Sequence, residues 1–484
     1  MAALRGRSRG RGCSPASRAH SATPGVAGRS RYFVGYLSES GAQHVRAYKY
    51  AGGDDSLILK YVTNPIYERL VLLFPTWLAP NIITLAGLCC TASTYVLFHH
   101  YCPFLYGVAP WWAYVLNAMS ILAYQGLDAM DGKQARRTGS GSALGLLFDH
   151  GCDAFNGTIM SLTMCSVAQM GPGLVSFTMW MSATAVFLSA TIEEFYTGEM
   201  RLGLINGPNE GLMIAVVSNL VTAFIGPHFW NAPSPFLGMP WNKALLALTI
   251  LCGFVTKIDN WCRIFGAIWS KRRTACLRWR VYPELGKFNY FVAMSRFAPF
   301  LLLCFGTFVW IAISPSNIMQ RHPRVMSWVM GFLFSKLATM LMLSHITDDE
   351  YHPMSRTYWL VVGVGFQFVV SCCFSDVNCW DVVSLQALRG AWQGGRDYNM
   401  HGMPSEAVRE PVSTMFTLFV QPPVWTQEDF LLYELLVITG VSYFHYVFRI
   451  VLEVSGALNV SVFSIPYPNK ACKPTKPAGQ SSKD

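Results

Sequence analysis

Long runs of apolar residues, separated by short polar stretches, dominate the chain. Each run is close to the ~20 residues that a helix needs to cross a bilayer. The runs fall at residues 82–99, 110–130, 143–170, 173–195, 209–227, 243–269, 289–313, 324–345, 356–375 and 428–453. The pattern therefore predicts an all-α polytopic membrane protein with about ten transmembrane helices. No internal repeat is visible, which argues against a transporter built from duplicated halves.

The segment before the first run has a different pattern. Residues 56–77 place apolar side chains at helical spacing but also carry Lys60, Glu68 and Arg69. This mixture predicts an N-terminal amphipathic helix that lies in the membrane interface. Residues 1–31 hold seven arginines and no acid. We expect a solvated, disordered basic tail there, although its composition also resembles a mitochondrial transit peptide.

These patterns divide the chain into successive regions. We expect a basic disordered tail at 1–44, the interfacial helix region at 45–81, the catalytic helices at 82–227, further transmembrane helices at 228–375, a luminal loop insertion at 376–427, and the last transmembrane helix with a basic cytosolic tail at 428–484.

Composition agrees with a membrane protein. The chain is 52% hydrophobic and only 13% charged, whereas soluble proteins carry about 25% charged residues. Lys and Arg account for a net charge of +10, but they gather in short loops and tails, so the charge does not indicate nucleic-acid binding. These basic loops follow the second and sixth runs, and the positive-inside rule places both termini in the cytosol.

Four aspartates lie where the second run ends and the third begins. Asp128 and Asp131 are three residues apart, and Asp149 and Asp153 are four apart, so on helices each pair shares one face. A charged side chain at the centre of a membrane helix costs roughly 2.5–3.5 kcal/mol on insertion scales. Four carboxylates at this depth predict a functional site with positive charge among them, facing the cytosol.

The surrounding residues indicate the kind of site. Carboxylates without neighbouring cysteine ligands suit hard cations such as Mg²⁺ or Mn²⁺. Lys133, Arg136 and Arg137 follow the first pair, and small residues such as Gly132 and Gly145 leave room for a ligand. Together they predict a diphosphate bridged by metal ions and contacted by basic side chains.

The stretch resembles the signature of the CDP-alcohol phosphatidyltransferase family, D-x-x-D-G-x-x-A-R-x8-G-x-x-x-D-x-x-x-D. Its fixed positions are Asp128, Asp131, Gly132, Ala135, Arg136, Gly145, Asp149 and Asp153. The resemblance implies transfer of a phospho-alcohol from a cytidine diphosphate donor to an acceptor hydroxyl, with release of CMP. It also implies that the four aspartates hold two Mg²⁺ ions, with Mn²⁺ as an alternative.

The donor would lie beside the basic end of the same stretch. The resemblance assigns contacts with the donor phosphates to Arg136, with Gly132 and Lys133 beside it. Asn81 begins the first run next to the site, and its amide could read the donor nucleotide. Asn is equally suited to cap a helix N-terminus.

The reaction also needs a base for the acceptor hydroxyl, and two residues compete for that role. Asp153 is the general family candidate. His150 titrates near neutrality, whereas a metal-bound carboxylate is a poor base. It follows Asp149 by about 100° of helix, so it borders the metal site without ligating it. We favour His150, although a purely structural histidine is the alternative.

Further strings resemble the eukaryotic choline/ethanolamine phosphotransferases of that family. They are residues 75–84, 131–138 and 148–153. The resemblance implies CDP-ethanolamine or CDP-choline as donor, diacylglycerol as acceptor, and a homodimer in the endoplasmic reticulum or Golgi membrane. Glu193-Glu194, followed by an aromatic residue and Thr-Gly, slightly favours ethanolamine.

Several alternatives remain open from the sequence. An enzyme with the same signature could use another acceptor, and a divalent-cation transporter could hold a carboxylate site. Glu193 and Glu194 could attract the amine of the donor or simply be solvated at a helix end. Polar residues within the predicted spans, such as Lys336 and His345, could pair structurally or line a lipid cavity.

Overall fold

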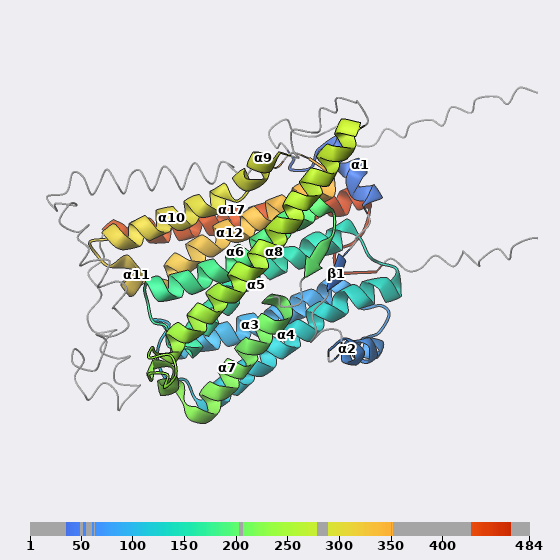
Figure 1. The fold of residues 1–484 in the computed structure, drawn as a ribbon. Coiled ribbons are helices and arrows are strands. Elements are labelled where there is room, and N and C mark those ends of the chain that lie inside the picture. Colours follow the sequence, from blue (N-terminus) through green and yellow to red (C-terminus); the bar gives the residue numbers. More distant parts are fainter. Residues whose placement is uncertain are drawn as a thin grey trace, which may run out of the picture.

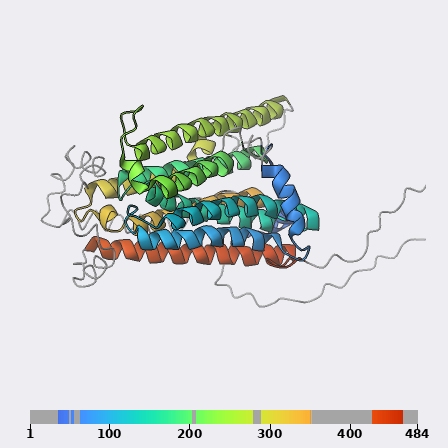
Figure 2. The same cartoon turned by 90° about the horizontal axis from the view of Figure 1, so that it is seen from below.

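The computed structural model describes residues 35–48, 52–54, 61, 63–202, 207–277, 289–349, 351 and 427–465. Long helices lie alongside one another and form a bundle, as two views at right angles show (Figures 1 and 2). Within the described residues the strands are β1 (Gly52–Asp54) and β2 (Met200–Leu202), which pair in parallel. The predicted all-α class is therefore confirmed apart from this small two-stranded element.

The helices follow the predicted runs closely. The long ones are α3 (Pro80–Tyr101), α4 (Trp111–Thr138), α5 (Ala143–Val167), α6 (Leu174–Thr197), α7 (Leu212–Ile225), α8 (Trp241–Leu277), α10 (Ala298–Ile313), α12 (Pro323–Thr347) and α17 (Gln427–Leu458). Short elements connect them: η3 (Gly207–Gly211), η4 (Pro227–Asn231), α9 (Tyr290–Ser295) and α11 (Ile318–Arg321). The predicted run 289–313 is thus split into α9 and α10.

Six stretches of the described chain are long and apolar enough to cross a membrane. They are Pro80–Tyr101, Leu174–Thr197, Trp241–Lys271, Tyr290–Ile313, Pro323–Thr347 and Glu428–Leu458. They indicate an integral membrane protein, while the total of ten spans stays a prediction. The predicted run 356–375, residues 1–34 of the basic tail and nearly all of the 376–427 insertion lie outside the described residues.

The region before α3 differs from the predicted single interfacial helix. It contains α1 (Glu39–Ala47), β1, α2 (Asn64–Leu70) and the single turn η2 (Val71–Leu73). Pro65 lies in the first turn of α2, where a missing N–H costs nothing. The described helical part of residues 56–77 is therefore short, and its place in the interface stays a prediction.

A tight reversal joins α4 and α5. Gly139 ends α4 with a φ of +66°, a left-handed conformation that glycine adopts without a steric penalty. Ser142 then begins α5, and its side chain accepts a hydrogen bond from the backbone N–H of Gly145. The resulting hairpin fixes which faces of α4 and α5 oppose each other.

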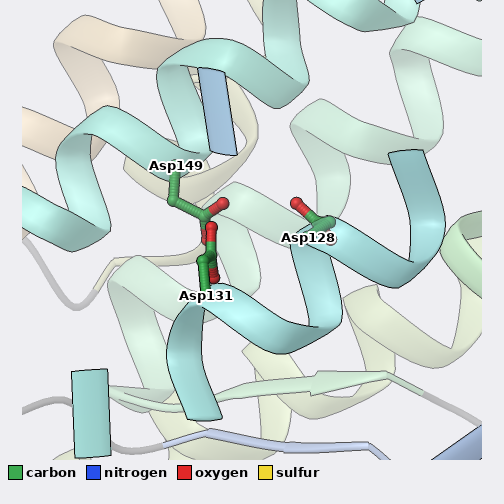
Figure 3. Close-up of side chains that lie close together, drawn as sticks. All are labelled: Asp128, Asp131 and Asp149. Carbon is green, nitrogen blue, oxygen red and sulfur yellow. The ribbon is translucent and has the colours of Figure 1, made fainter. Parts of the chain in front are cut away.

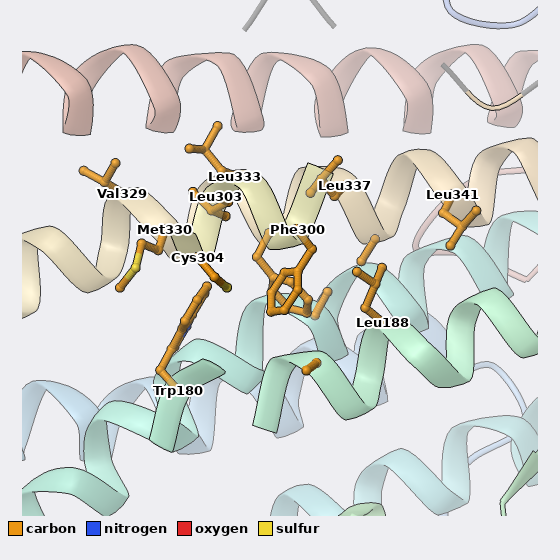
Figure 4. Packing of buried hydrophobic residues seen from close by; sticks show 14 of the residues in the cluster. Trp180, Leu188, Phe300, Leu303, Cys304, Val329, Met330, Leu333, Leu337 and Leu341 are labelled. Atoms are coloured by element: carbon orange, nitrogen blue, oxygen red, sulfur yellow. The ribbon is translucent and has the colours of Figure 1, made fainter. Parts of the chain in front are cut away.

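A large apolar cluster supports this hairpin from the side of α6, α10 and α12 (Figure 4). The ring of Trp180 lies 6.2 Å from that of Phe300 and 6.0 Å from that of Phe334, centroid to centroid. Gly331 of α12 lies so close to α5 that an added Cβ would meet Thr158 at 2.7 Å. Small residues permit such close helix approach in membrane bundles, and α12 is thereby held against the helix that carries Asp149.

Candidate active site

The hairpin brings together aspartates from two different helices, α4 and α5. Asp128, Asp131 and Asp149 each offer one carboxylate oxygen, and these oxygens all lie within 4.8 Å of one another. Figure 3 shows the first two on α4 pointing toward Asp149 on α5. Three of the four predicted aspartates thus lie together in the structure. Asp153 interacts with Asp128 at the edge of this group.

Two hydroxyl groups hold the cluster in place. The side chain of Thr84, on α3, donates a hydrogen bond to Asp131, and the phenol of Tyr124, on α4, donates one to Asp153. Both donors are buried. Sequence reasoning missed them, although Tyr124 lies one helical turn before Asp128. Hydrogen-bonded partners of this kind orient ligating carboxylates.

The cluster fits hard cations by its donor set. The Oδ1 atoms of Asp128 and Asp149 are buried and accept no hydrogen bond. Several carboxylates at such close range repel one another unless a positive charge lies among them. Oxygen ligands without sulfur or imidazole are those of Mg²⁺ and Mn²⁺. The residues present are therefore compatible with the divalent cations that the signature implies.

Two of the basic residues after Asp131, Lys133 and Arg137, lie apart from this cluster. Lys133 donates to the side chain of Asn64, on α2. Arg137 donates to the backbone carbonyls of Val71 and Phe74 at 2.9 and 2.7 Å. These two cations therefore tie the segment before α3 to α4. Lys133 turns toward α2, which gives it a structural partner in addition to its predicted contact with the donor.

Arg136 has a different position. Its side chain is exposed, and one guanidinium nitrogen would lie 3.7 Å from a Cβ added at Gly132. The guanidinium therefore reaches back along α4 toward the residue that follows Asp131. The absence of a side chain at Gly132 leaves this space open beside the aspartates. The predicted contact of Arg136 and Gly132 with a donor phosphate is compatible with this arrangement.

Asn81 does not cap α3. The N-cap residue is Ala79, without a side-chain hydrogen bond, so the capping interpretation is wrong. The side-chain amide of Asn81 instead donates to the backbone carbonyl of Val462 at 2.9 Å. Asn81 is 9% exposed and lies one turn before Thr84, so it borders the aspartate cluster on the α3 side.

His150 is buried beside the cluster and contacts acceptors with both ring nitrogens. Nδ1 lies 3.1 Å from the carbonyl oxygen of Leu146, and Nε2 lies 3.2 Å from a carboxylate oxygen of Glu194. Carbonyl and carboxylate oxygens both only accept hydrogen bonds, so each ring nitrogen of His150 faces an acceptor. This geometry suits an imidazolium that carries a proton on each nitrogen and is paired with the Glu194 carboxylate.

The two adjacent glutamates of α6 have separate partners. Glu194 is fully buried, and Glu193 is 1% exposed, so solvation at a helix end is wrong for both. Glu193 pairs with Arg263 of α8 at 3.1 Å, whereas Glu194 faces His150. The other polar residues within predicted spans also pair: Lys336 donates to Ser442, and His345 bonds to Tyr48.

The short helix α2 closes one side of the site. Tyr67 packs against Gly126, where an added Cβ would lie 3.3 Å from its ring. Burial and the nearby carboxylate of Asp128 raise the pKa of Tyr67. Residues that precede the first long helix therefore pack against α4 close to Asp128.

Comparison with known proteins agrees with this geometry. The sequence profile described as CDP-alcohol phosphatidyltransferase matches residues 77–269, which include all four aspartates. A choline/ethanolaminephosphotransferase of Arabidopsis thaliana is 31% identical over 328 residues, which cover 65% of this chain and 80% of that protein. The chain belongs to the CDP-alcohol phosphatidyltransferase family.

Other members of the family extend the similarity. A CDP-alcohol phosphatidyltransferase class-I family protein of Dictyostelium discoideum is 32% identical over 65% of this chain and 82% of that protein. A cholinephosphotransferase of Xenopus laevis is 29% identical over 69% of this chain and 79% of its own length. This family member is accordingly a phosphotransferase of phospholipid synthesis, and it carries an aspartate cluster whose oxygens suit divalent cations.

Proposed function

We propose that this enzyme transfers phosphoethanolamine or phosphocholine from the CDP-alcohol to diacylglycerol and releases CMP. The product is phosphatidylethanolamine or phosphatidylcholine. The observation that carries the proposal is the Asp128, Asp131 and Asp149 cluster, set within a complete signature in a chain similar to choline/ethanolaminephosphotransferases. The string from Glu193 to Gly198 supports ethanolamine as the preferred head group.

The four aspartates are proposed to hold two Mg²⁺ ions. When bound, such ions would neutralise the acids and supply positive charge that stabilises the CMP leaving group. Asp128, Asp131 and Asp149 supply the close oxygens. Thr84 and Tyr124 keep the carboxylates of Asp131 and Asp153 oriented toward the same space.

Arg136 is proposed to hold the donor phosphate. Its planar guanidinium suits phosphate oxygens, and its exposed side chain turns back toward Gly132. These two features support a positive charge beside Gly132, where the diphosphate would extend beyond the aspartate cluster. Lys133 contributes at longer range, since it is already bonded to Asn64.

His150 is proposed to accept the proton of the diacylglycerol hydroxyl at Nε2. Nδ1 faces the carbonyl of Leu146, which would keep a proton on Nδ1 while Nε2 takes up the second. Once Nε2 is protonated, the Glu194 carboxylate 3.2 Å away stabilises the imidazolium. Asp153 is less suited to this step because it is already bonded to Tyr124. Burial of His150 and Glu194 keeps bulk water away from the pair.

The membrane setting is also part of the proposal. Diacylglycerol reaches the site sideways from the bilayer, and the CDP-alcohol reaches it from the cytosol. The basic residues at and after the ends of α4 and α8 support this orientation. We place the enzyme in the endoplasmic reticulum or Golgi membrane as a homodimer.

One assay tests the reaction. The purified full-length protein is mixed with diacylglycerol, Mg²⁺ and either CDP-ethanolamine or CDP-choline, and CMP and lipid product are followed. Release of CMP with formation of the matching phospholipid is expected, faster with CDP-ethanolamine. Absence of CMP with both donors contradicts the proposed reaction, and a faster rate with CDP-choline contradicts the head-group preference.

A further inference from the structure

A short segment after the last helix lies against the active-site helices. We call residues 459–465 the C-terminal strap. It begins at Asn459, whose φ is +55°, and the backbone N–H of Val460 donates back to Ser455 at 3.2 Å. The chain thus turns sharply at the end of α17 and does not continue away from the bundle.

The strap contacts both helices that border the aspartate cluster. The carbonyl of Val462 accepts the hydrogen bond of Asn81, on α3. The ring of Phe463 meets that of Phe148, on α5, edge-on at 5.9 Å between centroids. Val460 and Val462 pack against the apolar cluster that contains Leu144 and Leu147. The strap is therefore anchored by one polar and several apolar contacts.

The contact with Val462 sets the orientation of the Asn81 amide. A carbonyl only accepts hydrogen bonds, so the NH₂ group of Asn81 must face it. Its Oδ1 then points the other way, to within 3.8 Å of a Cβ added at Gly145. The side chain thus presents an acceptor toward the signature glycine of α5.

The space in front of this oxygen adjoins the aspartates. On α3, Asn81 lies one turn before Thr84, which bonds Asp131. On α5, Gly145 lies one turn before Asp149. Helix neighbours three and four residues apart share a face. Asn81 and Gly145 therefore lie side by side, one helical turn from the cluster toward the start of α3 and α5.

We propose that the C-terminal strap forms one wall of the binding site for the nucleotide half of the donor. Val462 holds Asn81 with its oxygen toward the nucleotide, and Phe463, 48% exposed, adds a half-open aromatic surface beside Phe148. This inference rests on the proposed function, because it takes the donor to be a cytidine diphosphate ester. The strap is a positioning element, and the phosphoryl chemistry stays with the aspartates.

Two truncations test the strap. A chain that ends at Leu458 lacks it, whereas a chain that ends at Ile465 keeps it and serves as the control. We expect the shorter chain to show about a tenfold higher KM for the CDP-alcohol, with the KM for diacylglycerol unchanged. The control truncation is expected to match the full chain. Equal donor KM values for both truncations would overturn the inference.

Point variants cover the case in which the shorter chain does not fold. Asn81→Asp keeps the size of the side chain but sets an oxygen against the Val462 carbonyl, and Phe463→Ala removes the aromatic surface. Both are expected to raise the KM for the donor severalfold. Phe448→Ala, at a 65% exposed position of α17, is the matched control. An unchanged KM for the donor in both variants would refute the proposed role of the strap.

Failure of the proposed function gives a different result. If the unmodified protein releases no CMP from any CDP-alcohol, the donor class is wrong. If it releases CMP normally and the variants keep its donor KM, only the role of the strap is wrong.

Discussion

Nε2 of His150 lies 3.2 Å from the carboxylate of Glu194, and both side chains are buried within the helix bundle. The pair joins α5, which carries two of the aspartates, to α6, which carries none. The proposed base and the carboxylate that would stabilise its protonated form thus come from neighbouring helices. The spatial relationship suggests that the two residues act together on one proton.

Loss of either member of this pair should slow turnover without weakening donor binding. His150→Ala and Glu194→Gln are each expected to lower kcat about 10²–10⁴-fold, the usual contribution of a general base, with the donor KM nearly constant. Steady-state CMP release measures both values. Glu193→Gln is the matched control, because Glu193 faces Arg263 instead. Near-normal kcat in His150→Ala would remove His150 from the reaction.

The aspartate cluster should be indispensable. Asp128→Asn, Asp131→Asn and Asp149→Asn each remove one charge from the group of close oxygens. Each is expected to lower kcat/KM by at least about 10²-fold, as the loss of one electrostatic contact at a transferring group does. Asp259→Asn, on the exposed pair with Arg263 of α8, is the control. Activity above a tenth of normal in all three variants would contradict the assignment.

The hydroxyl groups of Thr84 and Tyr124 should affect how tightly the site binds Mg²⁺. Thr84→Val and Tyr124→Phe remove the donors to Asp131 and Asp153 while keeping the shape of the side chain. We expect the Mg²⁺ concentration for half-maximal rate to rise about 10–100-fold, with activity recovering at high Mg²⁺. Thr163→Val is the control, since the buried Thr163 donates to the carbonyl of Ile159 on its own helix, away from the cluster. A lower rate that no Mg²⁺ concentration restores would contradict this role.

Removal of divalent cations should stop the reaction reversibly. Excess chelator is expected to abolish CMP release, and added Mg²⁺ or Mn²⁺ to restore it, because oxygen-only sites bind both ions. Zn²⁺ should restore it poorly, as the cluster offers no sulfur or imidazole. Full activity in the presence of chelator would show that the aspartates serve another purpose.

Close packing between α5 and α12 should be sensitive to a single methyl group. Gly331→Ala would place a Cβ 2.7 Å from Thr158, and overpacking of this kind costs about 1–3 kcal/mol. The variant is expected to unfold at a lower temperature in detergent. Gly266→Ala on α8, where nothing lies within 4 Å of the added Cβ, should be as stable as the parent protein. Equal melting of the two variants would show that the helices separate easily.

The apolar runs predicted the positions of most described helices, and the spacing of the aspartates predicted which side chains share a face. Spacing along α4 and α5 was enough to give each pair of aspartates a shared face, and the short segment between the two runs indicated that these faces meet in a hairpin. The ranges of α3, α5 and α12 also lie within a few residues of their apolar runs. The range of a helix depends mainly on the residues of its own apolar run, so it can be predicted without knowing how the helix packs against others.

Contacts between separate helices were not predictable in the same way. The pairing of Glu194 with His150, the bond from Thr84 to Asp131 and the bond from Asn81 to Val462 depend on how one helix is rotated and shifted against another. That register follows from the packing of many side chains. Asn81 was expected to meet a ligand or cap its helix, and its protein partner lies 381 residues further along the chain.

Because the C-terminal strap follows α17, the proposed donor site can be completed only after α17 has been made. The aspartates, the proposed base and its glutamate partner are all present once α6 has emerged, yet the proposed wall beside Asn81 is made only after α17. A nascent chain therefore lacks part of its donor site until α17 has inserted. Full affinity for the soluble substrate would arise only in a chain whose last helix has packed against α12, which links enzyme activity to completed membrane assembly.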